Sequence, residues 1–366
     1  MIDEMNLHRI LEQWDLDGKI LSVKPFGQGH INSTFCITIG SETDPHRYIL
    51  QKISSTAFKY PDQLMANVVS VTEYLRKKII QSGGNPDRET ITILPTRNGR
   101  SFCIDEREEA WRILLFIENT VCLQSAETPE LFEASARAFG KFQYLLRDYP
   151  ADTLFETISR FHDTENRYEN LMRAAEEDPL GRASSVKAEL EFARMRKEDC
   201  GVCLRALREG RLPLRVTHND TKLNNVLMDA DTLEAICVID LDTVMPGLAC
   251  NDFGDSIRFG ANHCAEDEPD LSKVEFDLEL FRVYTRGFLE GANHALTQAE
   301  MESLPWGAKL MTLECGMRFL TDYLEGDHYF ATQREGQNLD RCRTQFKLVS
   351  DMEANWEAMK EIVASF

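Results

Sequence analysis

The chain has 366 residues, which is too long for one small hydrophobic core and is most simply organised as two lobes or domains. With 43% hydrophobic and 28% charged residues, the composition is that of an ordinary globular protein and excludes a disordered or fibrous one. The formal net charge of -20 argues against a nucleic-acid partner, because phosphate backbones bind to basic surfaces.

The sequence also predicts a cytoplasmic protein without membrane association. Residues 1–6 lack the basic and apolar regions of a secretory signal, and no run of about eighteen apolar residues could span a bilayer. The ten cysteines are scattered, which favours reduced thiols over a disulfide framework. Cys200 and Cys203 form the one Cys-x-x-Cys motif, but no second pair or nearby His completes a metal site.

The N-terminal part of the chain is predicted to form a small β-rich lobe. Strands at 20–26 and 33–39 flank a segment that contains Gly27, Gly29 and His30. The two glycines would let backbone N–H groups approach a triphosphate, although Gly-x-Gly in a hairpin is more often a plain turn. His30 could contact a substrate, or it could be an exposed turn histidine.

The third strand, 47–53, stands where a kinase carries the Lys that holds the α- and β-phosphates. Gln51 and Lys52 both lie there, and strand alternation allows only one of them to face the cleft. Lys52 is chemically the better phosphate partner, while the register of the strand stays open. A helix over about 62–78 offers Glu73 either as a partner for that Lys or as a solvated surface residue.

The apolar strand 111–119 should be buried on both faces. Its polar end at Glu118 and Asn119 predicts the hinge between the lobes, where backbone groups could hydrogen-bond to adenine. We therefore expect a nucleotide-binding lobe over 1–118 and a helical C-terminal lobe over 119–366 that holds the catalytic and acceptor sites. This is an α+β, two-lobed architecture of the protein-kinase type. Helical periodicity is strongest at 127–145, 165–175, 185–208, 278–291, 305–327 and 340–365.

The residues with assignable chemistry lie in 217–242. His218-x-Asp220, then Asn225, then an apolar strand that ends at Asp240, is the order in which kinases place a catalytic base and two metal ligands. The spacing therefore predicts phosphoryl transfer with Asp220 as the base.

The apolar runs on either side of the polar turn 229–234 should pair as a hairpin. If Met228 faces Cys237, then Asn225 faces Asp240, because antiparallel pairing keeps the sum of the two residue numbers constant. An amide oxygen beside a carboxylate is a hard oxygen site that suits Mg²⁺ with a bound phosphate.

Two further segments need interpretation. Asp252-Phe253-Gly254 matches the D-F-G string of protein kinases, but it lies too far from Asn225 to share the hairpin, so we expect Asp252 to brace a loop from a helix N-terminus. The segment 314–327 combines carboxylates and Arg318 on an apolar helix, which could form a polyol-binding wall or surface ion pairs.

These motifs resemble those of the aminoglycoside-phosphotransferase-like kinases and, more closely, of the N-acetylhexosamine 1-kinases. The similarity is carried by 29–32, 48–51, 217–225, 239–247, 252–260 and 314–327. It implies ATP-dependent phosphorylation of GlcNAc or GalNAc at the anomeric hydroxyl. Separately, we expect a monomer. The resemblance further implies that Asp220 is the base, that Asn225 and Asp240 bind Mg²⁺, and that His30, Arg318 and Tyr329 contact the sugar. The main departure from kinases in general is that the third-strand Lys is not clearly assigned.

Two alternatives stay open at this point. The phosphate chemistry does not name the acceptor, so the substrate could be an aminoglycoside, choline or another sugar. A non-catalytic kinase-fold binding module is the other reading, although the joint presence of Asp220, Asn225 and Asp240 argues for turnover.

Overall fold

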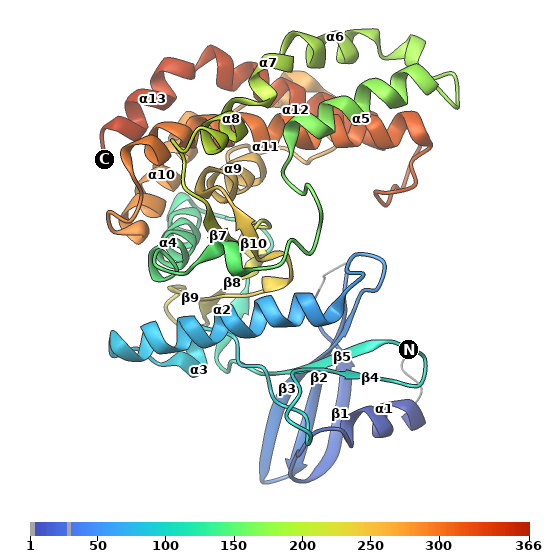
Figure 1. Ribbon diagram of the computed structural model, residues 1–366, viewed down its shortest axis with the longest axis vertical. Coiled ribbons are helices and arrows are strands. Elements are labelled where there is room, and N and C mark those ends of the chain that lie inside the picture. Colours follow the sequence, from blue (N-terminus) through green and yellow to red (C-terminus); the bar gives the residue numbers. More distant parts are fainter. Residues whose placement is uncertain (1–3, 28–30) are drawn as a thin grey trace.

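The computed structural model describes residues 4–27 and 31–366 (Figure 1). Its N-terminal part is a five-stranded antiparallel sheet in the order β1-β2-β3-β5-β4. The strands are β1 (Lys19–Pro25), β2 (Ser33–Ser41), β3 (Asp44–Ile53), β4 (Cys103–Ile104) and β5 (Ala110–Leu115). Helix α1 (Glu4–Leu11) covers one face of this sheet, and its apolar side chains join Trp14, Ile37 and Trp111 in a buried cluster. Strand β5 is almost completely buried, as its apolar sequence predicts.

Helix α2 (Pro61–Gln81) connects this sheet to the rest of the molecule (Figure 1). Leu64, Val68 and Val71 on its apolar side are fully buried. They belong to a core cluster that also contains Ile53 of the sheet and Leu241. Leu241 lies in the segment 217–242, called the catalytic segment below because it holds the predicted base and metal ligands. The helix therefore packs against both parts of the fold. The short helix α3 (Pro86–Glu89) follows it.

Two smaller sheets carry the catalytic segment. One pairs β7 (Arg215–Thr217) with β10 (Met245–Gly247), and the other has the order β6-β8-β9. In the second sheet, β6 (Thr120–Cys122) and β9 (Ala235–Val238) flank β8 (Val226–Asp229). The predicted hairpin is therefore present as β8 and β9.

The C-terminal part is helical, with α11 (Gln298–Glu325) as its long central helix. The expected start at Pro305 is wrong, because Thr297 and Glu300 form a capping box that begins the helix one to two turns earlier. The other helices are α4 (Pro129–Leu145), α5 (Thr164–Glu177), α6 (Lys187–Met195), α7 (Lys197–Cys200), α8 (Val202–Arg208), α9 (Ala249–Gly260), α10 (Leu278–Ala292), α12 (Gln337–Ala354) and α13 (Trp356–Ala364). None of the helices that the structure describes combines the length and apolar composition needed to cross a bilayer.

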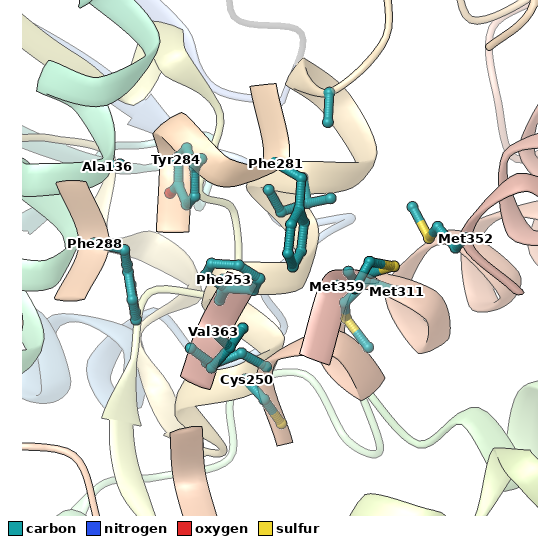
Figure 2. Close-up of a cluster of buried hydrophobic side chains, with 14 of the residues drawn as sticks. Ala136, Cys250, Phe253, Phe281, Tyr284, Phe288, Met311, Met352, Met359 and Val363 are labelled. Carbon is teal, nitrogen blue, oxygen red and sulfur yellow. The ribbon is translucent and has the colours of Figure 1, made fainter. Parts of the chain in front are cut away.

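The core of the helical part lies where α9, α10 and α11 meet (Figure 2). The Phe253 ring is fully buried and packs edge-on against Phe281, Tyr284 and Phe288, with ring centroids 5.4–5.7 Å apart. At Gly254, an added Cβ would lie 2.1 Å from the carbonyl oxygen of Gly307, so α9 and α11 can approach this closely only with glycine. Two residues of the D-F-G string therefore serve packing. The expected α+β, two-lobed, kinase-like fold is confirmed.

Candidate active site

The loop between β7 and β8, residues 218–225, holds the predicted base and is called the catalytic loop below. It is held in place by helix α9. The Asp252 carboxylate, in the first turn of α9, accepts hydrogen bonds from the backbone N–H groups of His218 (2.9 Å) and Asn219 (2.8 Å). Gln143 of α4 donates a third hydrogen bond to the same carboxylate. Burial raises the pKa of Asp252, while these hydrogen bonds oppose that shift. The predicted role of Asp252 as a brace is confirmed.

His218 is a buried structural residue of this loop. Its Nε2 lies 2.8 Å from the carbonyl oxygen of Ile239, and its ring packs edge-on against Phe139 and Phe142. The next residue, Asn219, has a left-handed backbone with φ of 66°. This turn brings the Asp220 carboxylate out of the core to a partly exposed position.

The Asp220 carboxylate is held by two neighbours. Lys222 Nζ lies 2.7 Å from Oδ1, and Asn225 Nδ2 donates to Oδ2 at 3.0 Å. Asn225 Nδ2 also donates to the Asp220 carbonyl oxygen at 2.8 Å. Burial alone would lower the pKa of Lys222, but Asp220 and Asp255 outweigh it, so the pKa is raised and the cation is retained. Sequence reasoning missed Lys222, although its place two residues after the expected base was visible.

The expected pairing of Asn225 with Asp240 is wrong by one residue. The hairpin pairs Leu227 with Cys237, and a bulge shifts Met228 to Ala235. Asn225 therefore lies opposite Ile239, whose N–H donates to its carbonyl oxygen at 2.9 Å. The sum rule holds along the regular ladder at Val226 and Leu227, and the error lies in the assumed starting pair, because Cys237 faces Leu227 and not Met228. Asp240 is nevertheless the next residue, at the end of the hairpin.

The surroundings of Asp240 suit a cation. Solvent reaches this residue, yet desolvation by the surrounding protein, together with the charges of Asp242 and Asp220, raises its pKa to about 6. Within the described residues, no donor is hydrogen-bonded to its carboxylate or to Asn225 Oδ1. The part of the chain that the structure describes has no cluster of three or more His, Cys, Asp or Glu at metal-binding geometry. Mg²⁺ does not require one, since it commonly takes one or two protein carboxylates with substrate phosphates and water.

On the third strand, the structure does not support Lys52 as the phosphate ligand. Its Nζ lies 2.8 Å from Glu109, whereas Glu73 of α2 is exposed. Gln51 occupies the other face of β3 and accepts two hydrogen bonds from Arg112 of β5, at 2.9 Å and 2.8 Å. Arg112 in turn reaches Asp242 in the catalytic segment. Strand alternation thus turns Gln51, and not Lys52, toward the catalytic side.

A Lys52→Ala variant is therefore expected to behave almost like the parent. Its ion pair with Glu109 is about one-third exposed, and such pairs contribute roughly 0–1 kcal/mol to stability. Nucleotide KM and kcat should stay within about threefold of the parent values, because less than 1 kcal/mol changes a binding constant by only a few-fold. Steady-state kinetics with varied ATP measures this, and a fall of two orders of magnitude would restore Lys52 as a phosphate ligand.

Of the other predicted nucleotide contacts, the structure describes Gly27, which follows strand β1, and Glu118, which follows strand β5. Gly27 has φ of 77°, which glycine adopts without strain. Gly29 and His30 lie outside the described residues. Glu118 is exposed, its carboxylate pairs with Arg47, and its carbonyl oxygen accepts a hydrogen bond from Arg88 at 2.7 Å. The hinge carbonyl therefore already has a protein partner.

A buried polar cluster lies beside the catalytic loop on the side of the C-terminal helices. Glu314 of α11 lies 3.1 Å from His162 Nδ1 and accepts a hydrogen bond from Thr164 at 2.9 Å. His162 Nε2 is 3.4 Å from the carbonyl oxygen of Asn219, the residue before Asp220. Nothing local in the sequence marks His162, since its partner Glu314 lies 152 positions away.

Arg318 and Tyr329 extend this cluster outward. Arg318 Nη2 lies 3.4 Å from the Tyr329 hydroxyl, which is on a highly exposed residue. The Arg167 Nε atom is buried and has no hydrogen-bonding partner among the described residues. Burial lowers the pKa of Arg167. The charge of Glu314 opposes this shift, and the charge of Arg318 adds to it. Asp322, another acid of the segment 314–327, accepts backbone hydrogen bonds from residues 328–330 and is structural.

The His162–Glu314 pair should make stability depend on pH. Burial alone would lower the pKa of His162, but its hydrogen bond and ion pair with Glu314 raise it. Since the folded pKa lies above the unfolded value of about 6.5, the stabilisation is complete below that pH and is lost as pH rises through the folded pKa. Urea unfolding of the parent and of His162→Gln between about pH 5.5 and 8.5 tests this: the difference in unfolding free energy should shrink as pH rises. A constant difference would contradict it.

Comparison with known proteins agrees with this geometry. The sequence model of the phosphotransferase enzyme family matches residues 22–287. An aminoglycoside phosphotransferase from Alicyclobacillus acidocaldarius superposes with a TM-score of 0.64 at 13% identity, covering 100% of this chain and 97% of the other. Choline kinase from Cryptosporidium parvum superposes with a TM-score of 0.56 at 15% identity, covering 94% and 91%. An ADP-bound aminoglycoside phosphotransferase gives 0.52 at 13% identity, covering 96% and 99%.

The family match spans well over half of the chain, so the protein belongs to the phosphotransferase enzyme family. It is an enzyme, a small-molecule phosphotransferase.

Proposed function

We propose that the protein transfers the γ-phosphoryl group of ATP to the anomeric hydroxyl of an N-acetylhexosamine, GlcNAc or GalNAc, and forms the sugar 1-phosphate. The nucleotide part is supported by the fold, since a similar structure was determined with ADP. The proposed division of labour places the nucleotide in the lobe formed by residues 1–118, with Gly27 and Gly29 beside its phosphates, and the acceptor in the lobe formed by residues 119–366.

The hydrogen-bond donors around the proposed acceptor site support the choice of substrate. Burial alone would raise the pKa of Glu314, but the charges of His162, Arg167 and Arg318 lower it. His162 also lies within hydrogen-bonding distance of this carboxylate. The buried Arg167 Nε atom has no hydrogen-bonding partner among the described residues, so it favours a ligand with an acceptor oxygen, which the ammonium groups of an aminoglycoside or of choline do not offer. A neutral sugar with hydroxyl and acetamido oxygens offers acceptors to these donors. The site therefore favours an uncharged amino-sugar derivative over the alternatives.

In the proposed reaction, Asp220 orients the sugar hydroxyl in line with the γ-phosphorus and accepts its proton. Lys222 and Asn225 hold the two carboxylate oxygens of Asp220, so the base keeps one orientation. Asn225 and Asp240 would hold Mg²⁺, which when bound neutralises charge on the transferring phosphates. Arg318, Tyr329 and His30 are the proposed sugar contacts.

A panel of acceptors tests the substrate. GlcNAc, GalNAc, glucose, choline and kanamycin are compared by ADP release in the presence of Mg·ATP, and the product is examined by phosphorus NMR. We expect turnover with the N-acetylhexosamines and an anomeric phosphate signal coupled to H1. Preferred turnover of kanamycin or choline, or a phosphate elsewhere on the sugar, would overturn the proposal.

A further inference from the structure

The catalytic segment contains a second aspartate, Asp242, whose carboxylate contacts Arg112 and Asn32 of the N-terminal part. Asp242 lies two residues after Asp240, in the short helix η4 (Leu241–Thr243), and its side chain is 4% exposed. Its Oδ1 lies 2.6 Å from Arg112 Nη1, and its Oδ2 accepts a hydrogen bond from Asn32 Nδ2 at 2.6 Å. Oδ2 is therefore hydrogen-bonded, whereas Oδ1 is ion-paired with Arg112 but has no partner of hydrogen-bonding geometry among the described residues.

The cation of this pair is anchored in the sheet. Arg112 is 2% exposed, and its Nε and Nη2 both donate to Gln51 Oε1. Gln51 lies opposite Arg112 in the register of β3 and β5, and its Nε2 donates to Thr34 of β2 at 3.1 Å. The guanidinium is thus held on three strands before it meets Asp242.

The same network reaches the segment after the glycine-containing turn. Asn32 Oδ1 accepts a hydrogen bond from the Ser54 N–H at 3.0 Å, at the end of β3. On the opposite side, η4 is tied to the catalytic loop, because Thr243 Oγ1 donates to the His218 carbonyl oxygen at 2.6 Å. Asn32, Gln51, Arg112 and Asp242 therefore form one interlobe network between the N-terminal sheet and the segment that carries Asp220 and Asp240.

In protein kinases the third-strand Lys pairs with a Glu of the following helix, and this pair must form for activity. Here β3 presents Gln51 to Arg112, and α2 presents Met65 Sδ to Arg112 Nη1 at 3.6 Å in place of a carboxylate. We propose that Arg112 and Asp242 take over that positioning role: the interlobe network fixes strands β2, β3 and β5 of the N-terminal sheet relative to Asp240. Arg112 is a positioning residue, because it is too deeply buried to reach a phosphate.

The inference rests on the proposed use of Mg·ATP, and binding of Mg·ADP tests it without any acceptor. Isothermal titration is carried out on Arg112→Met, Asp242→Asn and the double variant, with Arg9→Gln as the control. Arg9 is also an arginine of the N-terminal part paired with a carboxylate, but its ion pair with Glu106 is exposed. Parent protein that does not bind Mg·ADP would contradict the proposed function itself. If the parent protein binds Mg·ADP and the variants bind it equally well, the positioning role of the interlobe network is wrong, while the proposed function is not contradicted.

We expect each single variant to bind Mg·ADP about tenfold or more weakly, as is typical when a residue that orients a metal ligand is lost. Arg9→Gln should stay within about twofold, because an exposed pair contributes little. Arg112→Lys should recover part of the affinity, since the charge is kept while the bidentate geometry is lost.

Two outcomes separate positioning from direct contact. If Arg112 bound phosphate, Asp242→Asn would free it and leave the affinity unchanged or higher, and that result would overturn the inference. Because an unpaired buried charge is costly, either single variant could fold poorly. The double variant removes both charges, so its Tm should exceed that of each single variant while its Mg·ADP affinity stays low. Parent-like affinity in the double variant would also overturn the inference.

Discussion

Asp220→Asn should lower kcat by about 10²–10⁴-fold, which is the usual contribution of a positioned general base. The substitution keeps the shape of the side chain, and the amide oxygen can still accept a hydrogen bond from Lys222 or Asn225. The amide cannot take the proton of the sugar hydroxyl. The loss should therefore appear in kcat, while Mg·ADP binding and Tm change little.

The measurement is single-turnover formation of sugar 1-phosphate, which separates the chemical step from product release. Asp231→Asn is a suitable control, because Asp231 is an exposed acid in the turn of the same hairpin. An Asp220→Asn protein with a rate near that of the parent would exclude Asp220 as the base. The reaction type would then need a different group to accept the proton.

Asp252→Ala is expected to have the largest effect on stability. The substitution leaves the buried N–H groups of His218 and Asn219 without an acceptor and also removes one of the two acceptors of Gln143 Nε2. Each unsatisfied buried group costs about 1–3 kcal/mol, so the loss should be on the order of 3 kcal/mol or more. Because those two residues directly precede Asp220, activity should fall even at temperatures where the variant stays folded.

Urea unfolding and activity at a low temperature test this prediction together. Asp62→Asn provides the control, since Asp62 is also an acid in the first turn of a helix but is exposed. That control should lose no more than about 1 kcal/mol, the size of a helix-dipole contribution. A loss of similar size in Asp252→Ala would mean that the loop does not depend on this carboxylate.

The sequence predicted the parts of the site that depend on local order. The spacing of Asp220, Asn225 and Asp240 needs only a loop and a hairpin, and both form from residues close together in the chain. The bracing role of Asp252 was also accessible, because an acid at the start of an apolar helix is a recognisable signal. The register of the hairpin was missed by one residue, since sequence periodicity does not fix which residues of two strands face each other.

The order of side chains in the sequence determined the reaction class, because a base and hard oxygen ligands at kinase spacing have few other uses. Only the tertiary structure decided which face of β3 meets the catalytic segment, and it selected Gln51 with Arg112 over Lys52. It also joined His162 to Glu314 across 152 positions and Asn32 to Asp242 across 210. Such contacts arise from how whole lobes pack, and no local pattern in the chain carries that information.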